Sequence, residues 1–215
     1  MAELKTNTAA ERGQGARPAP SLFPMFVKLE DRECLVVGAG RIAESKIPGL
    51  LEAGARVRVV APEANAALTE WARLGRIRWE RRAFTSEDLD GIFLVIAATF
   101  LPDLNAAVFH EAQQRHILCN AVDDPDHCDF YYPAVVRRGA LQLAISTAGL
   151  SPALAQRIRR ELEEQFGAEY AGWIEQLGEA REGLFAQNMD PEQRRQVLHQ
   201  MASRESFVAA KGGRQ

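Results

Sequence analysis

The sequence predicts an α/β protein in which a Rossmann-like parallel sheet is followed by a small dimerisation region and a C-terminal helical domain. Short apolar segments alternate with amphipathic segments as far as residue 120, and this alternation is typical of parallel strands joined by crossover helices. A glycine-rich turn, Gly38-Ala-Gly40, separates the first apolar segment from the first helical one. From Ser151 onward, apolar residues recur at helical spacing.

The first half contains five candidate strands. Residues 33–38 are apolar on both faces, as a buried parallel strand requires. Further strands are expected at 57–61, 77–82, 93–97 and 116–120, with helices over about 41–53, 64–74 and 101–114 between them. Pro48 lies inside the first of these helices, where a proline removes a hydrogen bond and costs about 3 kcal/mol. We therefore expect a kink there, or a helix that begins later.

The second half follows a different pattern. Residues 123–129 form an acidic loop. In residues 141–146 apolar and polar side chains begin by alternating, which predicts a strand that does not belong to the regular succession of strands and helices in the first half. Ser151 precedes Pro152, which is the preferred arrangement for an N-cap and the first helical residue. A last helix is expected to begin at Asp190.

Bulk composition excludes several classes. The net charge of −3, from 26 basic and 29 acidic residues, gives no general attraction to nucleic acid or to an anionic membrane. Three cysteines without a CxxC pair predict neither a disulfide framework nor a zinc site. No apolar run approaches the ~20 residues of a membrane helix, and no secretory signal is visible. We expect a cytoplasmic protein.

The segment Gly38-Ala-Gly40-Arg-Ile-Ala43 matches the G-x-G-x-x-A pattern of dinucleotide-binding turns. Its glycines let backbone N–H groups approach a pyrophosphate at a helix N-terminus. The same pattern also fits a βα turn without a ligand. Glu63, about 20 residues further on, is a candidate for holding the adenosine ribose, or else a surface glutamate. No Arg or Lys occupies positions 61–63, which favours NAD over NADP.

Two polar segments follow. Asn120 to Asp129 places carboxylates after a strand, at the edge where α/β sheets bind ligands, where they could provide a general base. The alternatives are a solvated acidic turn and, through His127 and Cys128, a transition-metal site; we predict no metal site. Residues 145–152 form a hydroxyl-rich turn before a helix, which fits either an anion site or a simple capping sequence.

On these residues the chain resembles the precorrin-2 dehydrogenase family, whose module also forms the N-terminal part of siroheme synthase. The resemblance runs from Phe23 to Arg160 and depends on several motifs in order. They are residues 23–26 with Leu29, 34–43 with Lys46, 51–55, 59–62, 96–99, 119–123, 130–133, and 145–147 with Ser151-Pro152. Two positions depart from the family: Ala148-Gly149 replaces a common Gly-Gly pair, and Pro48 replaces an ordinary helix former.

The resemblance implies NAD-dependent oxidation of the tetrapyrrole precorrin-2 to sirohydrochlorin and, in bifunctional members, insertion of Fe²⁺ into sirohydrochlorin. It implies Asp123 as the catalytic residue and a homodimer. The implied cofactor-binding residues are Gly38, Gly40, Arg41, Ile42, Pro62, Glu63 and Thr99. The implied substrate-binding residues are Asn120, Thr147, Ser151 and Arg157, with Arg137, Arg138 and Arg160 as further candidates for the substrate carboxylates. For each arginine, ordinary surface charge is the alternative.

The predicted organisation has four parts: a disordered tail over 1–22, an NAD-binding Rossmann domain over 23–115, a dimerisation region over 116–150, and a helical domain over 151–215. One alternative function is a non-catalytic NAD-sensing regulatory module. It explains the glycine motif but leaves the Asn120–Asp123 and Ser151-Pro152 matches unexplained. Another is an NAD-dependent dehydrogenase of small substrates, for which 215 residues leave little room for a separate catalytic domain.

Overall fold

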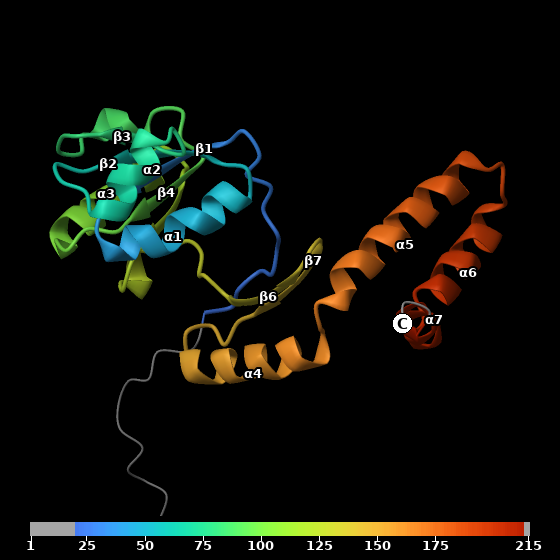
Figure 1. The fold of residues 1–215 in the computed structure, drawn as a ribbon. Helices are drawn as coiled ribbons and strands as arrows, with labels where there is room; N and C mark the ends of the chain where they lie inside the picture. Colours follow the sequence, from blue (N-terminus) through green and yellow to red (C-terminus); the bar gives the residue numbers. More distant parts are fainter. Residues whose placement is uncertain (1–19, 213–215) are drawn as a thin grey trace, which may run out of the picture. The chain divides into compact units, whose positions relative to one another are not determined.

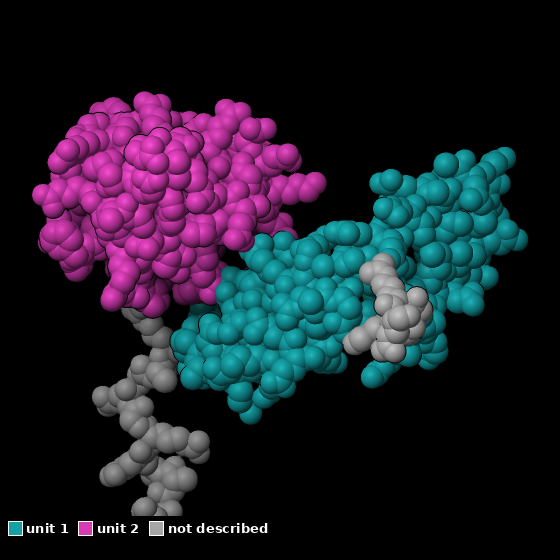
Figure 2. Space-filling model, in the orientation of Figure 1, with its two compact units in different colours: residues 1–22, 133–215 teal, residues 23–132 magenta. Residues whose placement is uncertain are grey.

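The structure, a computed structural model, describes residues 20–212. The chain divides into two compact units, which Figure 2 colours separately: unit 2 is Phe23–Tyr132, and unit 1 combines Pro133–Gln215 with the N-terminal residues. The predicted disordered tail over 1–22 lies almost entirely outside the described residues.

Unit 2, whose fold is drawn in Figure 1, is built around a five-stranded parallel sheet. The order of the strands in this sheet is β3-β2-β1-β4-β5. Its strands are β1 (Glu33–Val37), β2 (Arg56–Val60), β3 (Arg78–Glu80), β4 (Leu94–Ala97) and β5 (Leu118–Ala121). In register, Val36 of β1 pairs with Val59 on one side and Ile96 on the other. The chain leaves β1 in one direction to build β2 and β3, and returns to build β4 and β5. This is the predicted Rossmann-like arrangement, with its topological switch beside β1.

Helices cover both faces of the sheet because alternate strand residues point to opposite sides. On one face, α1 (Arg41–Glu52) and α2 (Ala66–Arg73) bury residues such as Ile47 and Leu68 against Val36. On the other, α3 (Pro102–Gln114) and the short helix η1 (Ser86–Leu89) pack against Leu35. The strands therefore have few polar side chains, and polar chemistry is restricted to the turns at their ends.

Two sequence predictions about this unit and its boundary need correction, and the strand that follows the unit was not predicted. The predicted boundary at residue 115 falls one strand early, because β5 pairs in parallel with β4 of the same sheet. The delayed start considered for the first helix is wrong: α1 begins at Arg41 and contains Pro48. The strand β6 (Ala134–Arg138) was not predicted, since its apolar part is only three residues long and ends in two arginines.

Unit 1 combines a two-stranded antiparallel sheet with helices. β6 pairs with β7 (Leu141–Ile145), followed by α4 (Pro152–Gln165), α5 (Glu169–Ala186), α6 (Pro191–Met201) and α7 (Arg204–Gly212). The helical content was predicted, but α6 and α7 are separate helices rather than one last helix. The aromatic rings of Tyr170, Trp173 and Phe207 stack between α5 and α7, with the centroids of Tyr170 and Phe207 4.4 Å apart.

The hydrophobic core of unit 1 is small. Among its described residues, the buried apolar side chains are Ala134, Val136 and Ala155. Large apolar side chains remain exposed in the same unit, including Leu150, which is 73% exposed, and Val208, which is 60% exposed. No described helix is both long and apolar enough to cross a membrane.

Candidate functional site: the carboxyl edge of the parallel sheet

The predicted cofactor and catalytic positions follow the ends of β1, β2, β4 and β5. Because these strands are parallel, the turns after them lie along one edge of the sheet, where open α/β sheets bind ligands. The turns after β1 and β4 carry Gly38–Gly40 and Thr99, and the turn after β5 carries Asp123. In the sheet, β4 lies between β1 and β5. The turn with Asp123 is therefore two strands away from the glycine turn, and neighbouring strands lie about 4.8 Å apart.

Gly38 fixes the close approach of the β1 and β4 turns. Its φ of +102° favours glycine, and a Cβ atom built there would lie 2.5 Å from the carbonyl oxygen of Ala98. Two backbone hydrogen bonds hold the same place: Gly38 N donates to Val60 O, and Ala98 N donates to Val37 O. Gly38 is therefore required by the protein's own packing, which is a different role from ligand contact.

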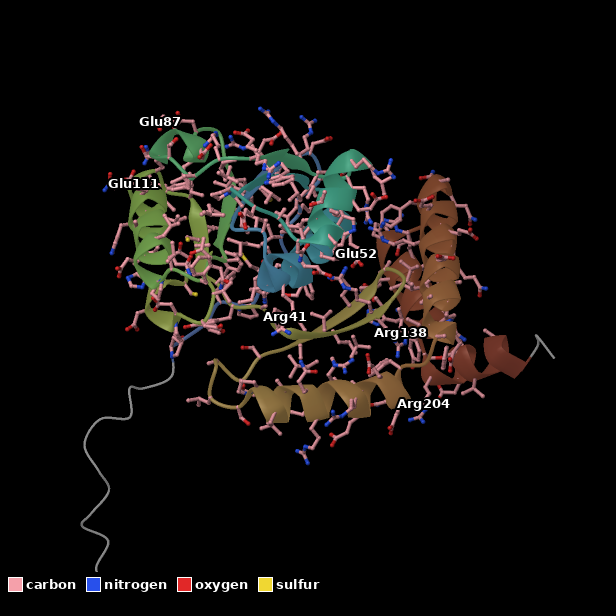
Figure 3. All side chains as sticks on the ribbon, turned by 60° about the vertical axis from the view of Figure 1, so that its left-hand side comes forward. Arg41, Glu52, Glu87, Glu111, Arg138 and Arg204 are labelled. Carbon is pink, nitrogen blue, oxygen red and sulfur yellow. The ribbon has the colours of Figure 1, made fainter. Side chains whose placement is uncertain are left out.

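Gly40 leaves an open space at the start of α1. It is the N-cap of the helix, without a side-chain capping hydrogen bond, and a Cβ atom on it would meet nothing within 4 Å. The first N–H groups of a helix have no intrahelical partner and favour an anion. Arg41, labelled in Figure 3 at the start of α1, and Ile42 are both exposed here. These features fit a dinucleotide pyrophosphate.

The turn after β2 is tied to the glycine turn by Asn65, which the sequence analysis missed. Asn65 N donates to Ala39 O at 3.1 Å, its Nδ2 donates to Glu44 Oε2 at 2.7 Å, and its Oδ1 accepts from Leu68 N. Pro62 and Glu63 are exposed on this turn. An asparagine directly before a helical pattern is a recognisable N-cap signal, but its long-range bond to Ala39 has no local signal.

Thr99 is held by a buried asparagine on α3. Its Oγ1 donates to Asn105 Oδ1 at 2.7 Å, and Asn105 Nδ2 donates back to Thr99 O. The hydroxyl of Thr99 is therefore engaged within the protein. Its backbone nitrogen lies beside the glycine turn, 3.1 Å from a Cβ built on Gly38.

Asp123 is exposed at the carboxyl end of β5 with φ of 61°, a left-handed conformation uncommon for a non-glycine residue. Such strain costs about 1–3 kcal/mol and is retained where surrounding contacts fix it, often at functional sites. Asp124 N donates to Ala121 O and closes the turn. The Asp123 carboxylate is thus presented at the same edge as the glycine turn.

The residues around Asp123 brace its turn. Asp124 Oδ2 lies 2.6 Å from His127 Nδ1, so Asp124 is engaged within the protein rather than directed only into solvent. Cys128 Sγ donates to Ala121 O at 3.1 Å. Asn120 is buried, and its Nδ2 donates to Phe130 O at 2.8 Å. The predicted substrate ligand Asn120 therefore has a structural role, because its amide joins β5 to the returning segment.

Lys46 brings a positive charge to this part of the unit. It lies on α1, half-buried, with Nζ 4.0 Å from the ring centroid of Tyr132. Burial lowers the pKa of Lys46, while Asp123 and Cys128 act in the opposite direction. In the sequence, only the family resemblance marks Lys46, and it implies no role for this residue.

The cysteines are not candidates for nucleophilic chemistry. Burial, with a smaller contribution from Glu33, raises the pKa of Cys34 to about 11. Burial also raises the pKa of Cys119 to about 12, with Asp129 and Cys128 adding to it. Both thiols therefore stay protonated near neutral pH. Across residues 20–212, no group of three His, Cys, Asp or Glu side chains is arranged to hold a metal ion.

The remaining predicted substrate residues belong to unit 1. Ser151 is the N-cap of α4, as predicted: its Oγ accepts from Leu154 N at 3.2 Å, and its N donates to Thr147 Oγ1. Arg157 is exposed and forms an ion pair with Glu161. Arg138, labelled in Figure 3, donates to the carbonyl oxygens of Phe166 and Glu163 at the end of α4. That bonding gives Arg138 a structural role and removes it as a candidate for the substrate carboxylates.

Comparison with known proteins defines the class. The family described as "Putative NAD(P)-binding" matches residues 25–134, and "Sirohaem biosynthesis protein central" matches residues 138–165. The first match covers the parallel sheet and the turn with Asp123, and the second covers the end of β6, β7 and α4. The chain is an NAD(P)-binding Rossmann protein, and the predicted NAD cofactor is confirmed at the level of this family.

Relatives narrow the class further. The structure of SirC, a precorrin-2 dehydrogenase, aligns with a TM-score of 0.75 and 30% identity over 87% of this chain and 92% of that one. Siroheme synthase 1 of Serratia proteamaculans is 42% identical over 159 residues, which are 74% of this chain and 33% of that protein. Siroheme synthase 1 of Pectobacterium atrosepticum is 40% identical over 86% of this chain and 36% of its own length.

The chain belongs to the siroheme-biosynthesis family of NAD(P)-binding proteins that includes SirC. It spans about a third of the length of the siroheme synthases that it matches. The predicted resemblance is confirmed.

Proposed function

We propose that this protein catalyses the NAD-dependent dehydrogenation of precorrin-2 to sirohydrochlorin, with Asp123 as its acid–base residue. The observation that carries the proposal is the placement of Asp123. Its carboxylate is exposed on a strained turn at the same sheet edge as the open helix N-terminus behind Gly40. Membership of the SirC family supports the substrate class.

The reaction removes two hydrogens from the tetrapyrrole. NAD⁺, when bound, supplies the acceptor for one of them as hydride, so that precorrin-2 and NAD⁺ give sirohydrochlorin, NADH and a proton. The Gly40 turn and the first N–H groups of α1 would hold the pyrophosphate of the dinucleotide. Asp123 accepts the proton at its carboxylate. Glu63 is proposed to hold the adenosine ribose and Arg157 a substrate carboxylate.

The test is anaerobic turnover of precorrin-2 with NAD⁺, followed by the absorbance of NADH and of sirohydrochlorin. Asparagine tolerates a positive φ, so Asp123→Asn preserves the turn while removing the base. We expect kcat to fall at least about a hundredfold, with NAD affinity unchanged. Asp126→Asn, on the same exposed loop, is the matched control and should retain activity. Wild-type protein that binds NAD but never turns over would instead support an NAD-sensing module.

A second activity is proposed at the same place, insertion of Fe²⁺ into sirohydrochlorin. The matched relatives are named for siroheme, the iron-bearing product. Since the described residues offer no three-ligand metal site, Asp123 would handle the protons released from the pyrrole nitrogens. Incubation of sirohydrochlorin with Fe²⁺ or Co²⁺ should give the metallated spectrum faster with wild type than with Asp123→Asn. Equal rates with and without protein would remove this activity.

A homodimer is proposed from the small core of unit 1. A unit with three buried apolar residues and several exposed large ones leaves apolar surface that a second copy would cover. Closed two-fold dimers are the commonest oligomers. Sedimentation at micromolar concentration should show a dimer, and a monomer there would contradict the proposal.

We also propose the cytoplasm as the compartment, in keeping with three free cysteines.

A further inference from the structure

The carboxylate of Asp124, directly after the proposed acid–base residue Asp123, does not make the bond that its position predicts. Asp124 is the N-cap of the short helix η2 (Pro125–His127), where an aspartate usually accepts from the first backbone N–H groups of the helix. Within the described residues, its carboxylate forms no such capping bond. Its Oδ2 lies 2.6 Å from Nδ1 of His127, at the other end of η2. The Asp124 side chain is therefore committed to the ring of His127 rather than to the helix backbone.

The ring of His127 is anchored to the core through α3. Its centroid lies 5.1 Å from that of Phe109, with the ring planes at 72°, which is the edge-to-face arrangement that aromatic rings prefer. Phe109 in turn packs against the buried apolar cluster that includes Leu35 and Val108. His127 is itself half-buried. A helix packed on the sheet therefore determines where Nδ1 of His127 points, and the hydrogen bond passes that constraint to Asp124.

The backbone of Asp124 is bonded as well as its side chain, which restricts the neighbouring Asp123. Asp124 N donates to Ala121 O at 3.2 Å and closes the turn. Asp124 O accepts from His127 N at 3.1 Å and from Cys128 Sγ at 3.2 Å. Asp123 has φ of 61°, an uncommon conformation that persists only where the surrounding structure fixes it. Among these contacts the bond to the Asp124 carboxylate is the strongest in kind, because its acceptor is ionised.

We propose that His127 is a positioning residue for Asp123: its ring, held against Phe109 of α3, binds the Asp124 carboxylate through Nδ1 and fixes the turn that presents the Asp123 carboxylate. An ionised carboxylate only accepts hydrogen bonds, so the hydrogen of this pair lies on Nδ1. The inference rests on the proposed function of Asp123. His127 acts through Asp124 and the peptide bond that joins it to Asp123, and no contact with substrate is assigned to it.

Two substitutions of His127 separate its hydrogen bond from its ring. His127→Phe keeps an aromatic ring against Phe109 but removes the donor, whereas His127→Asn places an amide N–H close to the position of Nδ1 but removes the ring. In His127→Phe, kcat for precorrin-2 should fall roughly tenfold, since a small displacement of a catalytic group has a large effect on rate. KM for precorrin-2 and Kd for NAD should stay unchanged. His127→Asn should retain most of the wild-type kcat. Each variant is assayed well below its unfolding midpoint, so that loss of folded protein does not lower kcat.

His110→Phe is the matched control. The ring of His110 lies 5.2 Å from that of His127, but within the described residues it forms no hydrogen bond to the turn, so this variant should keep the wild-type kcat. Asp124→Ala removes the acceptor, and adding His127→Phe to it should lower kcat little further, because the two side chains act as one unit. Full kcat in a folded His127→Phe protein would overturn the proposal. A rise in KM without a fall in kcat would assign His127 to substrate binding and overturn it as well.

Amide hydrogen exchange, followed by NMR without NAD or substrate, distinguishes failure of this inference from failure of the proposed function. The N–H of Asp124 donates to Ala121 O and is protected while the turn is closed. Its exchange should accelerate at least roughly tenfold in His127→Phe, as expected for loss of one hydrogen bond to a charged group, and should match wild type in His110→Phe. If wild-type protein fails to oxidise precorrin-2 but this exchange accelerates, the proposed function fails and the hold of His127 on the turn stands. If the exchange of Asp124 does not change, His127 does not position Asp123, whatever the activity.

Discussion

Gly38 lies so close to Ala98 that a Cβ atom on Gly38 would be 2.5 Å from the carbonyl oxygen of Ala98 and 2.8 Å from its carbonyl carbon. This contact joins the turns after β1 and β4 at the centre of the sheet. A Cβ atom built on Gly40, two residues away, would have no atom within 4 Å. The two glycines of one motif therefore differ: Gly38 is required by the protein's own backbone, whereas the open space at Gly40 is proposed to admit the dinucleotide.

Gly38→Ala should strongly destabilise the fold. The alanine would combine the left-handed strain at φ +102°, about 1–2 kcal/mol, with an overlap against backbone that cannot move without disturbing β4. We expect a loss of about 3 kcal/mol or more in the free energy of unfolding, measured by urea denaturation. Gly75→Ala is the matched control, because Gly75 has φ +68° and open space around it. Equal losses in the two variants would mean that the β4 turn moves aside freely.

Gly40→Val should fold but lose NAD. The new side chain meets no protein atom, and the N-cap position costs at most about 1 kcal/mol when glycine is replaced. Its isopropyl group would fill the approach to the first N–H groups of α1, so NAD binding by calorimetry should become undetectable. Gly49→Val, at an exposed position further along the same helix, should bind NAD normally. Normal binding by a folded Gly40→Val variant would place the dinucleotide elsewhere.

The strands and the dinucleotide turn could be predicted because their signals are local. An apolar run such as residues 33–37, followed by a glycine pair and a helical pattern, determines strand, turn and helix within twenty residues. β6 escaped prediction since its three apolar residues and two arginines resemble a loop. The boundary at 115 was placed too early because pairing of β5 with β4 is a long-range contact.

The polar support of the site could not be predicted for the same physical reason. Asn105 gave no reason in sequence to be paired with Thr99, and Asn120 gave none to be paired with Phe130, because these partners are chosen by tertiary structure. Arg138 was a candidate for substrate carboxylates, whereas it binds carbonyl oxygens 25 and 28 residues away. Composition and spacing identify which residue types are present near the edge, but folding decides which of their polar atoms are already bonded.

A buried cluster of charged side chains beside β2 and β3 should make the free energy of unfolding depend on pH in the acidic range. The Asp88 side chain is 2% exposed, and it accepts from Arg82 Nη1 at 2.8 Å and from Thr85 N at 2.9 Å, with Arg58 at 3.4 Å. Burial alone opposes ionisation, but the hydrogen bonds and the two guanidinium charges outweigh it and hold the pKa of Asp88 below the ordinary value of an aspartate. A carboxylate whose pKa is lowered by folding stabilises the folded protein at pH values above its unfolded-state pKa. This stabilisation is lost as pH falls through the lower pKa of the folded state.

Asp88→Asn should therefore lower the free energy of unfolding at pH 7 by about 2 kcal/mol, because it removes one carboxylate partner of Arg58 and Arg82, while Glu80 still pairs with both. As pH falls below about 4, the difference between Asp88→Asn and wild type should shrink, since Asp88 of the wild type becomes neutral, as the asparagine already is. Urea denaturation at a series of pH values measures this difference. Asp103→Asn, on the exposed first turn of α3, should show no such convergence. A difference that stays constant down to the acid transition would show that Asp88 contributes through shape rather than charge.

Ala148→Gly should stabilise unit 1. Ala148 has φ of 50° in the turn before α4, directly before Gly149 at φ 80°. The left-handed conformation costs an alanine about 1–2 kcal/mol, while glycine loses about 0.4–1 kcal/mol more entropy on folding. The net gain should be about 0.5–1 kcal/mol, seen as a higher urea midpoint at unchanged slope. Ala144→Gly, at an exposed position of β7, incurs the entropy cost without relief of strain and should destabilise. If both variants lose stability equally, the turn relaxes around Ala148, and the departure from Gly-Gly carries no strain.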